Sequence, residues 1–337
     1  MNNIVVTVMM SVYNTNISFL REAIDSVLQQ TFKDFEFLIT DDCSDAKTKQ
    51  VLDDYASRDK RVRIISNDTN KGLTMNLNHM IDEAKGKYLA RMDADDVCFP
   101  NRFMEQVQFL DHHPDIVMAG TWYNIIEKNQ VIGFKKEAYL PYQMKARLFF
   151  YNSGNMHSSM MMRRAVFNKA HNLLYDVTMK KTQDYDLWVR VTEKYKICLI
   201  PKVLMSYRVS DGQISTASYK SQSTYRDRVI VSQLGNLIEN YTSEEKQLHL
   251  SYCTGGDTYS SNIYMKWGKR LIESNHQLKL YDIRAFDYYA YSLMIRRMLR
   301  AVDRKLSISL CKQFIMYCYA MLRFYVCWGW DVITGHF

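Results

Sequence analysis

Glycine-rich phosphate loops are missing from this sequence. The chain of 337 residues holds only 12 glycines, and neither a G-x-G-x-x-G fingerprint nor a Walker loop occurs in it. Such loops cradle phosphates in dinucleotide dehydrogenases and nucleoside triphosphatases, so both classes are disfavoured. A nucleotidyltransferase would carry a glycine-rich loop near the N-terminus, but residues 8–14 contain no glycine. That alternative is weakened for the same reason.

Paired cysteines are missing as well. The seven cysteines form no Cys-x-x-Cys pair and match no zinc-ligand spacing. An odd, scattered set is typical of a reducing cytoplasm, where cysteine acts as a small hydrophobic residue. The first residues also lack a basic and apolar leader, so we expect no signal peptide and a cytoplasmic protein.

Net positive charge is small except near the end of the chain. The net charge is +8, and residues 260–337 hold twelve Lys or Arg against five Asp or Glu. This asymmetry indicates an anionic partner for the tail. Because the basic residues of the tail are interleaved with apolar ones, we expect that partner not to be a nucleic acid.

Strand and helix patterns alternate along the first third of the chain. Apolar runs rich in β-branched residues predict buried strands, and apolar stripes at helical spacing predict the helices between them. The expected strands are residues 4–12, 35–40, 62–66 and 88–92, and the expected helices are residues 17–30, 46–57, 73–84 and 101–112. This alternation indicates an α/β fold with a mostly parallel, Rossmann-like sheet flanked by helices.

The alternation loosens beyond residue 115. Strands are expected at residues 116–123, 130–134, 160–162, 197–200 and 204–209, and helices at residues 143–151 and 182–194. From about residue 218 onward the pattern is helical. We therefore expect an α/β domain over residues 1–217, with halves of about 1–98 and 99–217, and a helical C-terminal appendage over residues 218–337.

Polar residues follow three of the expected strands, at the point where each strand ends. They are Tyr13-Asn14, Asp41-Asp42 and an acidic segment, residues 93–96. In an open parallel sheet, ligands bind outside the carboxyl ends of the strands. Three polar sites therefore lie along one rim of the predicted sheet.

The acidic segment is the most informative of the three. It reads Asp93-Ala94-Asp95-Asp96. Alternate residues of a strand face the same way, so Asp93 and Asp95 can converge on one ion. Hard cations such as Mg²⁺ and Mn²⁺ take oxygen ligands and often arrive with a substrate's phosphates. Asp-x-Asp alone is common, and a solvated acidic turn would contain the same residues.

The other two strand ends suit a nucleotide. Asp41 or Asp42 can accept a hydrogen bond from the N3–H of a uracil, with Tyr13 beside the base. The alternative is that these residues only cap the helix that follows. After the third strand, Lys71 can neutralise a phosphate, and Gly72 lets the backbone approach closely.

The run QDYDLWVR, residues 183–190, carries a second strong pattern. Thr182 can cap a helix whose first turn contains Asp184, and Trp188 shares a helix face with that carboxylate. Asp184 is a candidate general base lying over an aromatic floor. The alternative is a carboxylate that only stabilises the helix dipole. Asp186 points elsewhere and can pair with Arg190.

Together these segments resemble the family 2 glycosyltransferases of the GT-A fold. The resemblance rests on VMMSVYN, LITDDCS, NKGL, ARMDADD and QDYDLWVR in this order, and it covers about residues 4–212. The runs ARMDADDVCFPNRFMEQVQFL, NSGNMHSSMMMRR and YRVS are similar to the bacterial branch that builds capsule, O-antigen and exopolysaccharide repeats.

The resemblance implies a role for each matching residue. Those that would bind the nucleotide sugar, most often through uridine, are Val12, Tyr13, Asn14, Asp41, Asp42, Lys71, Asp93 and Ala94. Asp95, with Asp93, would ligate the Mn²⁺ or Mg²⁺ that bridges the diphosphate, and Asp184 would deprotonate the acceptor hydroxyl. The residues implied on the acceptor or diphosphate side are His157, Gln183, Trp188 and Arg208.

The chain departs from the family pattern at two points. Gln183 stands where a Glu usually precedes the catalytic Asp, which removes one negative charge beside the base. The loop after Tyr207-Arg208 lacks the His of many relatives. Gln213 and Ser215 remain as candidate lid residues.

The resemblance implies inverting, metal-dependent transfer of a sugar from a UDP-sugar or similar donor to a hydroxyl of a saccharide acceptor. It also implies that the acceptor is linked to polyprenyl diphosphate, in bacterial surface polysaccharide synthesis. The non-enzymatic alternative is a sugar-nucleotide-binding scaffold in a polysaccharide-assembly complex. Intact Asp93, Asp95 and Asp184 disfavour it.

The end of the chain is apolar without being long and uncharged enough to span a bilayer. Lys312 and Arg323 interrupt the apolar run of residues 310–330. An amphipathic helix in the membrane interface suits it better, with Trp328 and Trp330 in the headgroup layer. We therefore expect peripheral contact with the inner face of the bacterial plasma membrane. The alternative is a helical subdomain that packs on the catalytic domain or on a second subunit.

Overall fold

The structure, a computed structural model, describes residues 4–136, 140–152, 157–210, 219–256 and 259–300, and the helical residues 315, 316, 318, 319 and 322. The chain divides into two compact units, Met1–Ala138 with Gly154–Gln222 and Tyr139–Ser153 with Ser223–Phe337. The predicted lid residues Gln213 and Ser215 and the tail residues Lys312, Arg323, Trp328 and Trp330 lie outside the described residues.

The first unit is built on one curled sheet. Its strands are β1 (Val6–Val12), β2 (Phe35–Asp41), β3 (Val62–Ser66), β4 (Tyr88–Met92), β5 (Val97–Cys98), β6 (Ile116–Glu127), β7 (Gln130–Lys135), β8 (Met161–Arg163) and β9 (Lys196–Arg208). The strand order is β3-β2-β1-β4-β8-β6-β9-β5, and β7 pairs with β6.

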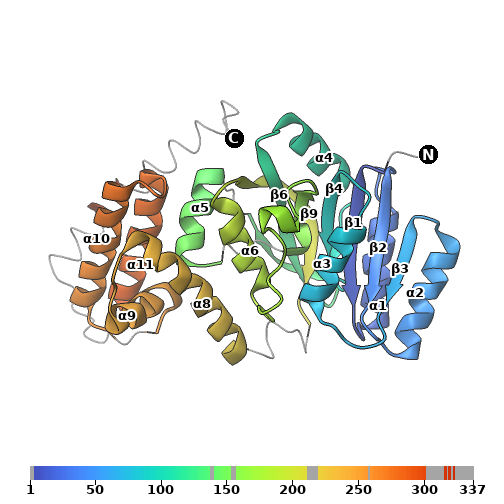
Figure 1. Cartoon of the computed structure of the whole chain (residues 1–337), viewed down its shortest axis with the longest axis horizontal. Helices are drawn as coiled ribbons and strands as arrows, with labels where there is room; N and C mark the ends of the chain where they lie inside the picture. The colour runs from blue at the N-terminus through green and yellow to red at the C-terminus, as the bar shows by residue number, and fades with distance from the viewer. Residues whose placement is uncertain are drawn as a thin grey trace. The chain divides into compact units, whose positions relative to one another are not determined.

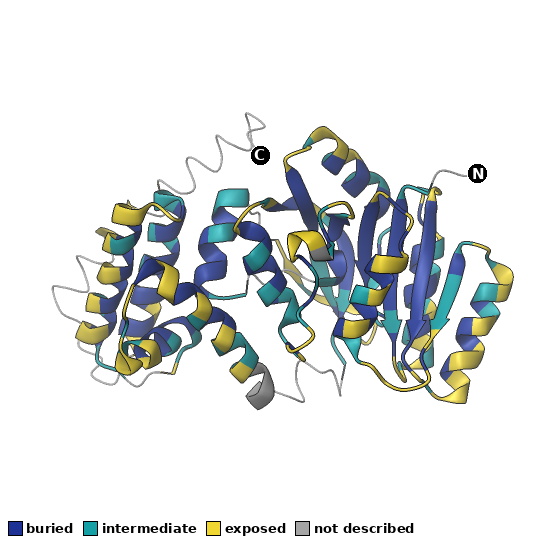
Figure 2. Cartoon of the chain, in the orientation of Figure 1, coloured by how far each residue is buried: buried dark blue, intermediate teal, exposed yellow. Residues whose placement is uncertain are grey.

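The sheet is parallel in its first half and mixed in its second. β3, β2, β1 and β4 are all parallel neighbours, as the sequence predicts. Beyond β4, strand β8 pairs antiparallel with both β4 and β6, whereas β6 and β9 are parallel. Every residue of β2 and β4 is buried, because helices cover both faces of the sheet (Figure 2).

The helices of the first unit connect and cover these strands. They are α1 (Ile17–Leu28), α2 (Ala46–Arg58), α3 (Leu73–Glu83), α4 (Arg102–His112) and α6 (Gln183–Thr192), with short 3₁₀ turns η1 (His157–Ser159) and η2 (Lys169–His171). Figure 1 shows α2 beside β3 at one edge of the sheet. Asn16 begins α1, because its side chain accepts hydrogen bonds from the backbone N–H groups of Ser18 and Phe19.

The second unit is helical. It contains α5 (Pro141–Phe150), most of α8 (Tyr219–Leu237), α9 (Ser243–Thr254), α10 (Ser261–Leu278) and α11 (Ile283–Arg300). Phe149 and Phe150 of α5 pack their rings against Tyr252 of α9 and Phe286 of α11. The sequence predicts the helix of α5 but assigns it to the α/β domain. In the structure its core contacts are with the C-terminal helices.

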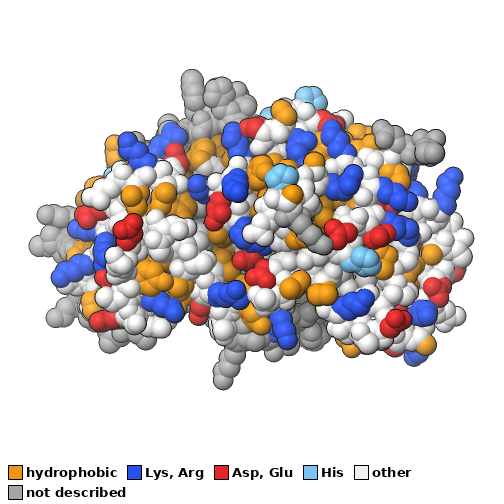
Figure 3. Space-filling model, viewed as in Figure 1, with side chains coloured by type: hydrophobic (Ala, Val, Ile, Leu, Met, Phe, Trp, Pro, Cys, Tyr) orange, Lys and Arg blue, Asp and Glu red, His pale blue; other side chains and the backbone are white. Residues whose placement is uncertain are grey.

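Each described helix is either too short or too polar to cross a bilayer. On the face drawn in Figure 3, Lys and Arg side chains are interspersed with Asp and Glu.

Candidate active site

The carboxyl ends of β1, β2 and β4 meet at one edge of the first unit's sheet. Strand pairing sets Val12 opposite Asp41 and Met10 opposite Met92. The residues that follow these strands are therefore neighbours. The Tyr13-Asn14 pair, Asp42 and the acidic segment thus share one rim.

The loops after β1 and β2 are joined by hydrogen bonds. Asn14 has a left-handed backbone (φ 48°), and its side-chain oxygen accepts from the backbone N–H of Asp45 at 2.8 Å. The N–H of Asn14 donates to Ser44 Oγ at 3.2 Å, and Asp41 Oδ1 accepts from the N–H of Ser44 at 3.0 Å. Tyr13 is left 54% exposed. A ring held at this rim can stack on a nucleobase.

Asp42 is buried and holds the turn that begins α3. Its carboxylate accepts from Asn67 Nδ2 at 2.9 Å and from the backbone N–H groups of Lys71 at 2.7 Å and Gly72 at 2.9 Å. Burial alone would raise the pKa of Asp42, but these hydrogen bonds outweigh burial and lower it. Val12 is buried, and its carbonyl accepts from the N–H of Asp42. The carboxylate faces its own chain, so its contact with a nucleobase stays a prediction.

The turn at residues 71 and 72 leaves room for a phosphate. Gly72 takes a left-handed conformation (φ 84°), which a side chain would strain. Lys71 is exposed beside it. The turn thus presents the Lys71 ammonium group next to a glycine that has no side chain to block a phosphate.

The acidic segment alternates between half-buried and buried residues. Asp93 and Asp95 are half-buried, and the Asp93 side chain is 37% exposed, whereas Ala94 and Asp96 are buried. Asp93 and Asp95 therefore share the outer side of the segment, as strand periodicity predicts. A buried arginine, Arg91, forms an ion pair with Asp93. Burial would lower the pKa of Arg91, but the charge and hydrogen bond of Asp93, together with the nearby Tyr175 and Asp96, outweigh burial and raise it.

The donor set of this rim fits a hard cation that arrives with its substrate. Among the described residues, His, Cys, Asp and Glu form no group of three that could hold a metal ion. One or two carboxylates would therefore serve as protein ligands, with phosphate and water oxygens completing the shell. This is the usual way in which proteins bind Mg²⁺.

Asp96 points inward and is fully buried. Ser158 Oγ donates to its Oδ2 at 2.5 Å, and the backbone N–H of Arg208 donates to its Oδ1 at 3.0 Å. Burial raises the pKa of Asp96 well above its usual value, and the charges of Asp93 and Asp95 raise it further. Asp96 therefore anchors the acidic segment from beneath.

Asp184 lies in the first turn of α6, close to the acidic segment. The link between them is Tyr175, which is 2% exposed. Burial raises the pKa of Tyr175; the nearby Arg91 opposes this, and the charges of Asp184 and Asp93 add to it. Both carboxylates thus act electrostatically on one hydroxyl group. Asp184 and Asp93 are therefore both within electrostatic reach of Tyr175, and a shared site for the base and the metal carboxylates stays a prediction.

His157 completes this cluster. Its Nε2 lies 2.7 Å from the Tyr175 hydroxyl, and its ring meets that of Trp188 edge to face, with centroids 5.6 Å apart. Burial lowers the pKa of His157 well below its usual value, and Arg91 lowers it further. His157 is therefore a neutral imidazole at physiological pH.

The loop before α6 is tied to the elements on either side of it. Asn78 of α3 bonds both backbone groups of Tyr175, at 2.8 and 2.9 Å. Arg190 of α6 donates to the carbonyls of Asn172 and Leu174, at 2.8 Å each. It also pairs with Asp186, as the sequence predicts. The helix that carries Asp184 is thus linked to α3, which begins at the phosphate turn.

Three predicted residues differ in detail from expectation. Thr182 stands at the N-cap of α6 with a left-handed backbone, but its side chain makes no capping hydrogen bond. Trp188 is fully buried, so it supports His157 from beneath and presents no surface to an acceptor. Arg208 is also buried, and its guanidinium bonds its own chain, so a contact with diphosphate finds no exposed surface. Gln183, the first residue of α6, is half-buried.

Sequence reasoning missed Arg91, Ser158 and Tyr175. Arg91 had a usable signal, because it stands two positions before Asp93 and so shares its side of the strand. Ser158 and Tyr175 had no such signal. Ser158 bonds Asp96 and Tyr175 bonds His157, and both partners are far away in sequence.

This arrangement was compared with known proteins. The family model described as "Glycosyl transferase family 2" matches residues 7–170. An uncharacterised glycosyltransferase of Methanocaldococcus jannaschii is 33% identical over 229 residues, which are 67% of this chain and 78% of that protein. The chain belongs to glycosyl transferase family 2. It is a glycosyltransferase, and the prediction from the sequence motifs is confirmed.

One further relative and one solved structure are also similar to this chain. WfgD of Escherichia coli, a UDP-Glc:α-D-GlcNAc-diphosphoundecaprenol β-1,3-glucosyltransferase, is 25% identical over 242 residues, covering 71% of this chain and 89% of that protein. The crystal structure of S. aureus TarS 1–349 with UDP-GlcNAc matches with a TM-score of 0.59 at 18% identity, over 94% of this chain and 89% of that one. This likeness supports the GT-A fold.

Proposed function

We propose that this glycosyltransferase is inverting and metal-dependent, and that it moves a sugar from a UDP-sugar to a hydroxyl of a saccharide acceptor. The observation that carries the proposal is the cluster around Tyr175: its hydroxyl lies 2.7 Å from His157, the His157 ring meets Trp188 of the helix that carries Asp184, and the charges of Asp93 and Asp184 both act on Tyr175. Metal-side and base-side carboxylates then serve a single reaction centre.

The donor side of the proposal is supported by the rim of the sheet. Tyr13 offers an exposed ring for a base, and Lys71 a cation for the diphosphate. Asp93 and Asp95 would hold the cation, Mn²⁺ or Mg²⁺, together with the diphosphate oxygens. The cation, when bound, supplies Lewis-acid stabilisation of charge on the leaving phosphate. TarS has been solved with UDP-GlcNAc and with UDP, which favours uridine here.

On the acceptor side, Asp184 accepts the proton of the attacking hydroxyl. General-base help of this kind contributes about 10²- to 10⁴-fold in rate. The hydroxyl attacks the anomeric carbon from the face opposite the leaving group, so an α-linked donor gives a β-linked product. His157 is neutral, so it adds no further positive charge to a site that already holds the Arg91 guanidinium.

We propose further that the acceptor is carried on polyprenyl diphosphate and that the protein works at the inner face of the bacterial plasma membrane. The acceptor named for WfgD is such a lipid-linked sugar. The basic tail supports attraction to anionic lipid, because residues 260–337 hold twelve Lys or Arg against five Asp or Glu.

The test uses the purified protein, a panel of UDP-, GDP- and dTDP-sugars, and an acceptor bearing a single sugar. We expect turnover with a UDP-sugar in Mn²⁺, loss of turnover on chelation, and a fall of at least about 10²-fold in Asp184→Asn. Asp186→Asn serves as the matched control, because Asp186 lies on the same helix and forms its ion pair with Arg190. Full activity in Asp184→Asn, or an α-linked product from an α-donor, would overturn the mechanism.

A further inference from the structure

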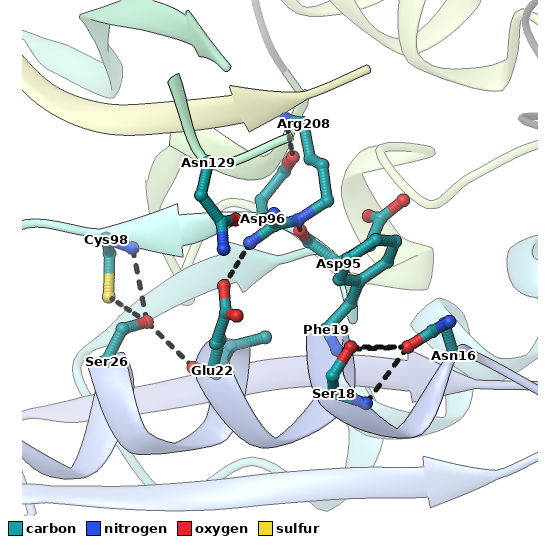
Figure 4. A network of polar contacts seen from close by, with 11 residues as sticks. Asn16, Ser18, Phe19, Glu22, Ser26, Asp95, Asp96, Cys98, Asn129 and Arg208 are labelled. Atoms are coloured by element: carbon teal, nitrogen blue, oxygen red, sulfur yellow. Dashed lines mark hydrogen bonds and ion pairs between the residues drawn. The ribbon is translucent and has the colours of Figure 1, made fainter. Parts of the chain in front are cut away.

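Arg208, the last residue of β9, is a buried residue at the centre of a polar network beside the acidic segment (Figure 4). It is 1% exposed. Its Nε donates to the carbonyl of Asp95 at 2.8 Å, its Nη1 donates to Asn129 Oδ1 at 2.8 Å, and its Nη2 pairs with Glu22. All three guanidinium nitrogens thus bond groups of this chain.

Two further contacts fix the same residue. The guanidinium lies 4.3 Å from the ring centroid of Phe19, a cation–π geometry. The backbone N–H of Arg208 donates to Asp96 Oδ1 at 3.0 Å. We call Arg208 and its partners Phe19, Glu22, Asp95, Asp96 and Asn129 the Arg208 hub.

The Arg208 hub joins three parts of the first unit that are far apart in sequence. Phe19 and Glu22 come from α1, and Asn129 comes from the turn between β6 and β7, where its backbone is left-handed (φ 62°). Asp95 and Asp96 come from the acidic segment. Guanidinium is a planar, permanently charged fork, so it bonds partners at fixed angles as no lysine could.

The contact that bears on chemistry is the one to the Asp95 carbonyl. It fixes the peptide between Asp95 and Asp96, and the backbone N–H of Arg208 and the hydroxyl of Ser158 hold the Asp96 side chain. With Asp96 held inside, the half-buried Asp93 and Asp95 lie on the outer side of the segment. Asp93 is held separately, by its ion pair with Arg91.

We propose that Arg208 is a positioning residue, which presets the Asp95 carboxylate for a divalent cation without touching the cation or the diphosphate. The proposal rests on the metal dependence proposed above. Glu22 and Asn129 support it: Glu22 balances the buried charge, and Asn129 fixes the rotation of the guanidinium fork.

Binding of Mn²⁺ in the presence of UDP, with no acceptor and no turnover, tests the proposal. Free Mn²⁺ is counted by electron paramagnetic resonance. Partners that orient metal ligands are typically worth about 10- to 100-fold in metal affinity. We expect Arg208→Lys to weaken Mn²⁺ binding in this range, and Glu22→Gln and Asn129→Gly to weaken it by smaller factors. Asn129→Gly keeps the left-handed turn and removes an exposed side chain, so it is expected to fold even where Arg208→Lys does not.

Arg163→Lys is the matched control. Arg163 also donates to backbone carbonyls, including those of Ile116 at 2.8 Å and His113 at 3.1 Å. It stands opposite Tyr88, at the other end of β4 from the acidic segment. We expect its Mn²⁺ affinity to equal that of the wild type.

The outcomes separate this inference from the proposed function. A wild-type protein that binds no Mn²⁺ with UDP overturns the metal dependence and this inference with it. A wild type that binds Mn²⁺, with unchanged affinity in all three hub variants, overturns this inference alone. An equal loss in Arg163→Lys also overturns it, because the effect would then reflect general loosening.

Discussion

At the residue scale, Tyr175 is the side chain whose surroundings matter most. Its hydroxyl is buried and shares a hydrogen bond with His157. Burial keeps both groups neutral, since it raises the pKa of the tyrosine and lowers that of the histidine. The neutral Tyr175–His157 pair therefore adds no charge to a site that already holds Arg91, Asp93 and Asp184.

Replacement of Tyr175 by Phe is expected to reduce stability. The change leaves Nε2 of His157 buried without its partner, which costs about 1–3 kcal/mol in the free energy of unfolding. Urea denaturation followed by circular dichroism measures the loss. Tyr13→Phe is the control, because its ring is 54% exposed and its hydroxyl has little to lose. Equal midpoints for Tyr175→Phe and the wild type would show that the hydrogen bond is absent.

At the scale of elements, the turn that begins α3 depends on one carboxylate. Asp42 accepts hydrogen bonds from the backbone N–H groups of both Lys71 and Gly72. We expect Asp42→Asn to loosen the turn, lowering stability by about 1–3 kcal/mol, because hydrogen bonds to a charged group are lost. It is also expected to weaken binding of UDP. Calorimetric titration with UDP measures the second effect.

The charge of Asp42 also makes the stability of the wild type depend on pH, and Asp42→Asn is expected to lack this dependence. The folded pKa is below the usual value of 3.8, so the unfolded chain takes up the proton first as pH falls. The contribution of Asp42 to stability is therefore fully present above pH 3.8 and is lost as pH falls through the folded pKa.

Asp45→Asn, which alters the cap of the neighbouring α2, is the control for UDP binding and is expected to leave UDP affinity unchanged. Wild-type UDP affinity in Asp42→Asn would contradict the role of the turn.

Elements with a strong local pattern were predictable from the sequence, and elements defined by distant contacts were not. The strands that became β1 to β4 are mostly apolar segments of five to seven residues, and the shared rim at their ends follows from parallel pairing. β5 has only Val97 and Cys98, too short for any period. β9 was predicted as two strands, because Pro201 interrupts the apolar run. The structure continues through it, with a shift of register beside Trp122.

The site was predictable to the same extent. Sequence motifs indicated Asp93, Asp95 and Asp184, and two of these, Asp93 and Asp184, both raise the pKa of Tyr175; their roles stay predictions. The motif assigned Arg208 to the substrate side, because a motif records that a residue is present but not which way it faces. Its burial among Phe19, Glu22 and Asn129 depends on three segments that only the folded chain brings into contact.

At the scale of the whole molecule, the second unit is built from two stretches of chain. Buried α5 residues such as Leu148, Phe149 and Phe150 pack within it, and Gln233 of α8 donates to the carbonyl of Leu148 at 2.9 Å. A chain that ends at residue 222 keeps α5 but loses its partners.

We expect such a truncated chain to aggregate or to bind a hydrophobic dye, because about 1.5–3 kcal/mol per large apolar side chain is forfeited when it is left in water. A chain that ends at residue 300 retains α8 to α11 and is expected to stay monodisperse. Size-exclusion chromatography with dye fluorescence compares the two. A monodisperse 1–222 chain that binds no dye would show that α5 needs no partner.

The interrupted path of the second unit sets an order of events during synthesis. The helix with Phe149 and Phe150 leaves the ribosome before the segment with Phe286, which follows 136 residues after Phe150. At about 5–20 residues per second, that is a delay of roughly 7 to 27 seconds. During this interval the apolar helix α5 has none of its partner helices, and nascent chains in that state are natural clients of chaperones.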